Sequence, residues 1–148
     1  LSTLGYTKGL IADAFVYHKR RITFRGFARQ VYKFGLARTI LMKWHPASRK
    51  RVFYLPTMAL IAGIILVVLG IFNPWYWYLI GFGVLVILVD ALFQTGNLIT
   101  SILAIPAVVV QITSYGWGFL KGWWNLLLWK RSEKERFPEM FKGQNHYF

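Results

Sequence analysis

A long apolar stretch without basic residues occupies the middle of the chain. Between Phe53 and Leu120 there is no Lys, Arg or His, and Asp90 is the single acid. A water-soluble domain needs a charged outer face, whereas a membrane-spanning helix needs about 20 mostly apolar residues. The pattern therefore predicts an integral membrane protein, or the membrane part of one.

Turn residues divide this stretch into three apolar segments. The Asn73-Pro74 turn and the polar residues 94–97 separate predicted spans at about 53–72, 75–93 and 98–120. The second span begins with the aromatic residues 75–78, which are typical of the head-group level of a bilayer. The predicted fold class is therefore an all-α membrane protein, in which a basic interfacial helix precedes about three transmembrane helices within a membrane region at 46–120.

The third segment leaves two interpretations open, because Pro106, Gln111 and Ser114 interrupt it. Its length favours a third span, but three crossings place the basic C-terminal tail outside, against the positive-inside rule. A re-entrant segment that turns at Pro106 would keep the tail inside, provided that protein shields its backbone. For residues 121–148 we expect an interfacial Trp-rich helix and then a polar tail, loosely ordered from Arg131.

Residues 22–45 have the pattern of a basic amphipathic helix. One stripe is apolar, and the bases on the opposite face follow at intervals of four. The stripe holds Phe24, Phe27, Ala28, Val31, Phe34, Gly35 and Leu41, and the opposite face holds Arg25, Arg29 and Lys33. Such a helix lies in the membrane interface, or it packs on a soluble domain. Arg38 falls on the apolar side, so either the helix bends at Gly35 or Arg38 extends toward lipid phosphate.

The charge distribution favours a membrane surface as the partner of the basic residues. The net charge is +13, and the 18 Lys and Arg residues lie on both sides of the apolar stretch. Bases next to apolar segments indicate anionic lipid and not nucleic acid. The Arg49-Lys50-Arg51 run predicts a cytoplasmic N-terminal side. With no Cys, thiolate metal sites are excluded and the redox compartment is unreadable.

The residues offer little catalytic chemistry of their own. The acids are dispersed, and no nucleophile triad, phosphate loop or metal cluster is recognisable. Asp90 lies near the end of the second span, where a structural anchor is favoured over a proton relay. Gly118 with Gly122, and Ala59 with Gly63, form small-xxx-small pairs that permit close helix contacts.

Residues 10–51 contain a recognisable order of features. Residues 14–18 predict a strand, within the string Ile11-Ala12-Asp13-Ala14-Phe15-Val16-Tyr17-His18-Lys19-Arg20-Arg21. Residues 24–38, then His45-Pro46, a basic run and membrane spans follow. This order resembles the C-terminal region of membrane-anchored family 2 glycosyltransferases of bacteria, over nearly the whole chain. The resemblance matches the string to the V-x-H-x-x-R strand that leaves the GT-A catalytic domain, so residues 1–21 would be its β remnant, and residues 24–38 to the family's Arg-Gln…Gly…Arg interfacial segment.

The resemblance implies a sugar transferase that uses a nucleotide-diphospho sugar, a divalent metal (Mg or Mn) and a lipid-linked or polysaccharide acceptor. The family's Asp-x-Asp metal motif and acidic base are not in these residues, so we expect neither a catalytic residue nor a bound metal here. The resemblance places His18 and Arg21 near the donor diphosphate. The candidates for acceptor or lipid phosphate are Arg25, Arg29, Gln30, Lys33 and Arg38. The Arg-Trp of the processive Gln-x-x-Arg-Trp motif is absent.

These observations lead to one functional hypothesis and one alternative. The first is the membrane-anchoring C-terminal module of a bacterial inner-membrane glycosyltransferase for a cell-envelope polysaccharide, inactive without its upstream domain. Its partners would be anionic lipids, the catalytic domain and a lipid-linked acceptor, with no nucleic acid. The alternative is a non-enzymatic multi-pass membrane subunit or scaffold of a larger complex.

Overall fold

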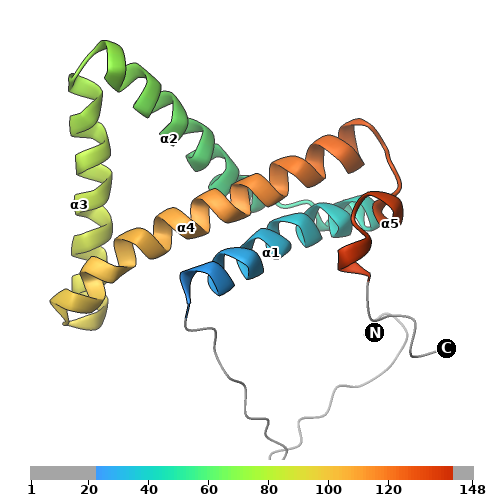
Figure 1. Ribbon diagram of the computed structural model, residues 1–148, viewed down its shortest axis with the longest axis horizontal. Helices are drawn as coiled ribbons and strands as arrows, with labels where there is room; N and C mark the ends of the chain where they lie inside the picture. Colours follow the sequence, from blue (N-terminus) through green and yellow to red (C-terminus); the bar gives the residue numbers. More distant parts are fainter. Residues whose placement is uncertain (1–22, 142–148) are drawn as a thin grey trace, which may run out of the picture.

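The computed structural model describes residues 23–141, which form helices joined by short turns, with no strand among them (Figure 1). The predicted strand and the β remnant at 1–21 lie outside the described residues. The α-helices are α1 Phe24–Trp44, α2 Leu55–Phe72, α3 Trp75–Thr95, α4 Leu98–Gly122 and α5 Glu133–Arg136. The other helical turns are 3-10 helices η2 Pro46–Ser48, η3 Arg51–Tyr54 and η5 Pro138–Met140, and the π-helix η4 Trp123–Leu128.

Helices α2, α3 and α4 form the three sides of a triangle, and α1 lies along the C-terminal part of α4 (Figure 1). At the first corner, Asn73 accepts a hydrogen bond from the backbone N–H of Trp75 at 3.0 Å. At the second, Gly96 has a left-handed backbone (φ 64°), which glycine adopts without strain, and Asn97 caps α4. The third corner is a contact between the start of α2 and α4.

Three helical stretches are long and apolar enough to cross a membrane, as the sequence predicts. They are Arg51–Phe72, Trp75–Thr95 and Leu98–Leu128, with mean hydropathies of 2.6, 2.0 and 1.8. Helix α3 contains no buried residue, and most of its large apolar side chains are exposed. A helix of this kind is stable in lipid and not in water. The described chain thus has the character of an all-α membrane protein.

Helix α4 continues through Pro106 as one helix. The chain therefore does not turn back at this residue, and the re-entrant interpretation is wrong. Proline removes a backbone hydrogen bond, but membrane helices tolerate this loss because neighbouring groups compensate for it. The helical path also extends beyond the predicted end at Leu120, because the π-helical turn continues it to Leu128.

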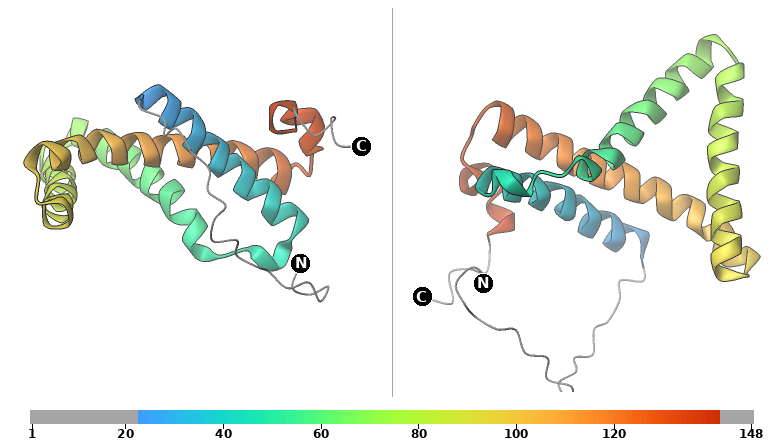
Figure 2. Two further views of the ribbon diagram at one scale, coloured as in Figure 1. Left: turned by 90° about the horizontal axis from the view of Figure 1, so that it is seen from below. Right: turned by 180° about the vertical axis from the view of Figure 1, so that it is seen from behind.

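The C-terminal segment (residues 129–141) is folded and does not extend loosely from Arg131, so that prediction is wrong for these residues. Lys130 takes a left-handed backbone (φ 50°), and the chain then returns toward α1 (Figure 2). Phe137, with 1% of its surface exposed, packs with Leu36, Ile40 and Leu126 in the hydrophobic core. The buried Phe137 ring and polar contacts with α1 and the π-helical turn hold this segment in place, although its average composition is polar.

Candidate functional site

The interface between α1 and α4 brings the two backbones into close contact at glycines. A Cβ atom on Gly35 would lie 2.9 Å from the backbone nitrogen of Phe119, and one on Gly122 would lie 3.0 Å from a methyl carbon of Leu36. A Cβ on Gly118 would likewise press on the backbone of Tyr32. The Gly118/Gly122 pair therefore provides the close helix contact that its spacing predicts.

The other predicted small-residue pair, Ala59 with Gly63, makes no contact of this kind. Nothing lies within 4 Å of a Cβ built on Gly63. Spacing alone did not distinguish the two pairs, because glycine is frequent in membrane helices generally.

Helix α1 has one face against α4 and a separate apolar face that stays exposed. The residues buried against α4 are Val31, Gly35, Leu36, Thr39, Ile40 and Met42. By contrast, Phe24, Phe34 and Leu41 of the predicted stripe keep 49%, 57% and 40% of their surface exposed. The basic side chains Arg25 and Lys33 are exposed as well. The helix thus keeps both an apolar surface for lipid tails and charges for head groups after it has packed on α4.

The residues predicted to bind phosphate do not converge on one site. Arg29 lines a cavity of about 500 Å³ with Tyr32 and Trp117. Arg38 lines a different cavity of about 450 Å³, whereas Arg25, Lys33 and the partly exposed Gln30 line neither. His18 and Arg21 lie outside the described residues. Of this set, Arg29 is exposed beside its cavity, whereas Arg38 is partly buried between α1 and α4.

The cavity around Arg38 lies between α1, the start of α2, and α4. The guanidinium carbon of Arg38 is 3.7 Å from the centroid of the Phe53 ring, a cation–π contact. Helix α1 continues unbroken through Gly35, so the position of Arg38 results from this contact without a break in the helix. The cavity is otherwise lined by Phe34, Ala37, Leu41, Val52, Pro56, Gln111 and Tyr115. We call it the Arg38 cavity.

Two polar residues of the Arg38 cavity were missed as site residues in the sequence. Gln111 and Tyr115 are four residues apart on α4 and thus lie on one face of that helix. Arg38 is the charged neighbour of the Tyr115 hydroxyl. The available signal was Gln111 itself, an amide inside an apolar segment, which we interpreted as an interruption of the span. Arg38, which lines the same cavity, lies more than 70 residues earlier, so spacing could not relate the two residues.

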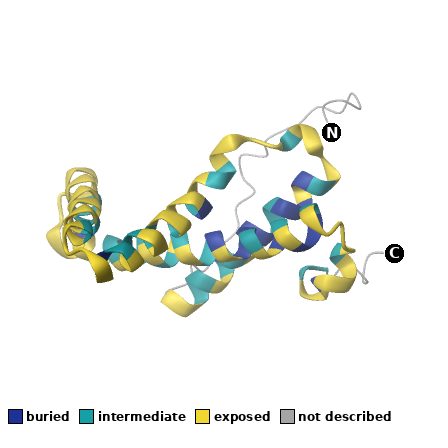
Figure 3. Ribbon diagram, turned by 90° about the horizontal axis from the view of Figure 1, so that it is seen from above, coloured by how far each residue is buried: buried dark blue, intermediate teal, exposed yellow. Residues whose placement is uncertain are grey.

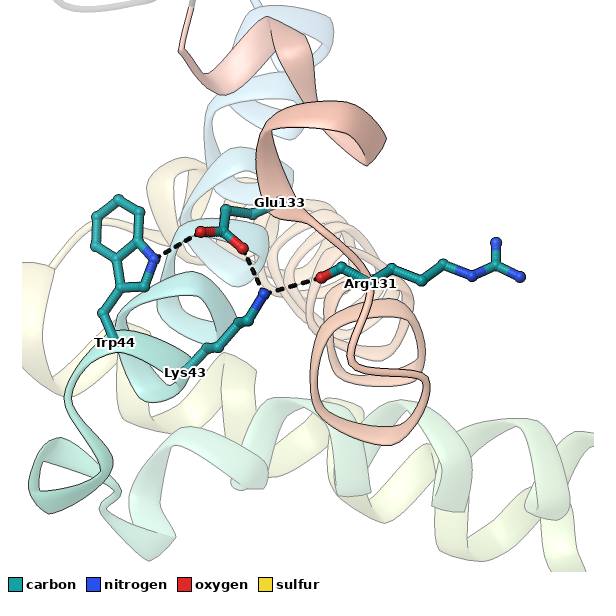
Figure 4. Close-up of polar contacts among 4 residues, drawn as sticks. All are labelled: Lys43, Trp44, Arg131 and Glu133. Atoms are coloured by element: carbon teal, nitrogen blue, oxygen red, sulfur yellow. Dashed lines mark hydrogen bonds and ion pairs between the residues drawn. The ribbon is translucent and has the colours of Figure 1, made fainter.

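An ion pair joins the C-terminal end of α1 to the C-terminal segment (Figure 4). The Lys43 ammonium contacts the Glu133 carboxylate at 2.5 Å and donates to the backbone carbonyl of Arg131 at 2.8 Å. The indole N–H of Trp44 donates to the other carboxylate oxygen at 2.9 Å. Hydrogen bonds from Lys43 and then Trp44 lower the pKa of Glu133 from 4.5 to about 2.

The remaining polar groups show no catalytic arrangement within residues 23–141. No three His, Cys, Asp or Glu side chains come together there to hold a metal ion. Asp90 accepts a hydrogen bond at 2.8 Å from Gln94, one helical turn later, at the exposed end of α3. This local contact satisfies the carboxylate close to a helix terminus.

The comparisons with known proteins add no relative. No protein-family model, curated protein or solved structure matches the chain.

Proposed function

We propose that this chain is the membrane-anchoring C-terminal module of a bacterial inner-membrane glycosyltransferase. The enzyme would transfer a sugar from a nucleotide-diphospho sugar to a lipid-linked or polysaccharide acceptor. One structural observation supports an anchoring role. Helix α1, which contains residues 24–38 of the transferase-like sequence, packs backbone to backbone on α4 through Gly35 and Gly118. A domain attached before α1 would therefore be joined to the apolar helices through a helix that is itself closely packed on them.

Such an anchor assists sugar transfer by positioning. An active site that is held next to the bilayer meets its membrane acceptor in a fixed orientation, and not by free diffusion in three dimensions. The exposed bases Arg25, Arg29 and Lys33 would hold α1 against anionic head groups, each contributing on the order of 1 kcal/mol.

The contacts of the C-terminal segment support a topology with an even number of complete crossings. Lys43 precedes all three apolar helices and Glu133 follows them, yet their side chains form an ion pair. A hydrocarbon core of about 30 Å would separate these residues after an odd number of crossings. Tyr54 at the start of α2 likewise packs on Phe119 of α4, with ring centroids 5.1 Å apart.

In this topology two sides of the triangle cross the membrane and the third stays on one side. The basic run 49–51 and the bases of the C-terminal segment then share the cytoplasmic side, in accord with the positive-inside rule. We expect a reporter enzyme fused after residue 148 to be active only in the cytoplasm. Periplasmic activity of that fusion would instead favour three complete crossings.

The functional proposal is tested on the whole protein. Its reading frame should encode an Asp-x-Asp motif in an upstream domain of about 250 residues or fewer. In the purified enzyme, Arg29→Glu with Lys33→Glu should slow sugar transfer to an acceptor embedded in anionic vesicles. Transfer to a soluble acceptor should be unchanged.

A matched control is Lys130→Glu with Lys134→Glu, which changes the charge equally on exposed residues of the C-terminal segment. If the two double variants lose the same activity, the role of α1 is wrong. A start codon shortly before Leu1 would contradict the transferase hypothesis. The alternative, a non-enzymatic membrane subunit, would then be favoured.

A further inference from the structure

We propose that the Arg38 cavity binds the anionic phosphate group of a membrane lipid. The inference deepens the role proposed for the module at the membrane, but it requires only that the chain lies in a bilayer. Sugar transfer is not part of its test, so this site and the transferase can fail separately.

The charge of Arg38 is the first argument. Its side chain is partly buried between α1, Phe53 and α4, where burial of an uncompensated charge is costly. In the part of the chain that the structure describes, Arg38 has no carboxylate partner, since the ion pair there joins Lys43 and Glu133. The Phe53 ring attracts the guanidinium but carries no negative charge. An anion that enters the cavity would balance the positive charge of Arg38.

The polar groups of α4 give a second, independent argument. Gln111 lies in an apolar helix, and its side-chain amide makes no hydrogen bond with any other described residue. Gln111 is exposed, so its amide takes a hydrogen-bond partner from outside the described protein, either water or a ligand. Gln111 and Tyr115 face the same cavity as Arg38, so one ligand can accept hydrogen bonds from all three side chains. A phosphate group, with several acceptor oxygens, has the required chemistry.

The walls of the cavity indicate that the phosphate belongs to a lipid. Phe34, Leu41 and Val52 line the cavity and keep 57%, 40% and 55% of their surface exposed. These apolar side chains continue the exposed face of α1, along which an acyl or isoprenoid chain would lie. A free phosphate ion would gain nothing from such walls. The neighbouring basic run 49–51 attracts anionic head groups to the same level of the bilayer.

The test is a binding titration on the full chain in a neutral detergent. Fluorescent phosphatidylglycerol is the first probe and a fluorescent polyisoprenyl phosphate the second, with inorganic phosphate as a competitor. Arg38→Gln should weaken lipid binding at least tenfold, because a charge-assisted hydrogen-bonding group is lost. Arg38→Lys should lose less, since it keeps the charge but not the planar donors. The matched control Lys134→Gln, on an exposed base of the C-terminal segment, should change affinity less than twofold.

The outcomes separate the explanations. If Arg38→Gln and Lys134→Gln weaken binding equally, lipid is attracted by the general basic surface, and the proposal is overturned. Competition by inorganic phosphate as effective as competition by unlabelled lipid would overturn the lipid assignment. The labelled probe that binds with the higher affinity identifies the class of lipid. If Arg38→Gln does not fold, as judged by circular dichroism, then Gln111→Leu and Tyr115→Phe replace it. Unchanged affinity in both would contradict the site.

Discussion

Two regions of this molecule bury apolar surface in different ways. Where α1, α4 and the C-terminal segment meet, side chains such as Leu36 and Phe137 are buried by protein. Figure 3 shows that the buried positions gather along α1 and the adjoining part of α4. In the hairpin of α2 and α3, Thr57 and Gly70 are the buried residues, and the large apolar side chains face outward. The first region resembles the core of a water-soluble protein, and the second depends on lipid as its solvent. The same hydrophobic composition thus serves two purposes, which mutations can separate.

The largest expected difference is between two phenylalanines. Phe137→Ala removes a ring with 1% of its surface exposed, and should lower the free energy of unfolding by about 3–5 kcal/mol. Phe93→Ala removes a ring on α3 with 87% of its surface exposed, and should have little effect on unfolding. Thermal unfolding of both variants in the same detergent measures the difference. Equal losses would mean that the C-terminal segment is not part of the core.

A smaller difference is expected between two glycines. Gly122→Ala places a Cβ against Leu36 and Thr39 and should destabilise the α1–α4 interface by about 1–3 kcal/mol. Gly63→Ala meets nothing within 4 Å, and should be neutral or slightly stabilising because alanine favours a helix. Chemical unfolding followed by Trp fluorescence compares the two variants. The close approach of α1 and α4 is contradicted if Gly122→Ala is as stable as Gly63→Ala.

The sequence predicted the apolar helices better than the contacts between them. Long runs of apolar residues identify a membrane helix from local information, so α2, α3 and α4 were predictable despite Pro106. The Arg38 cavity and the Lys43–Glu133 pair depend on residues far apart in the chain, the latter separated by 90 positions. Charge counting also missed the fold of the C-terminal segment, because its order depends on contacts with distant residues, such as Phe137 with Leu36 and Glu133 with Lys43.

The smallest effect expected concerns the ion pair that joins the two ends of the described chain. Glu133 has a pKa of about 2 in the folded protein, against an ordinary value of 4.5. A carboxyl group whose pKa is lowered by folding stabilises the protein fully above its ordinary pKa. As the pH falls from 4.5 toward 2, protonation of Glu133 removes this contribution. Because the pair is partly exposed and screened by solvent, the contribution should be about 1 kcal/mol or less.

Wild type and Glu133→Gln are therefore compared by thermal unfolding at several pH values. The wild type should be slightly more stable at neutral pH, and the difference should vanish as the pH approaches 2. Glu135→Gln is the matched control, since this carboxylate lies on the same helix and forms no ion pair within the described residues. It should show a much smaller change with pH. The same comparison is made in a Lys43→Ala background, where Glu133→Gln should no longer change the stability. Because Lys43 precedes the three apolar helices in the sequence and Glu133 follows them, this result would also demonstrate that both ends meet on one side of the membrane.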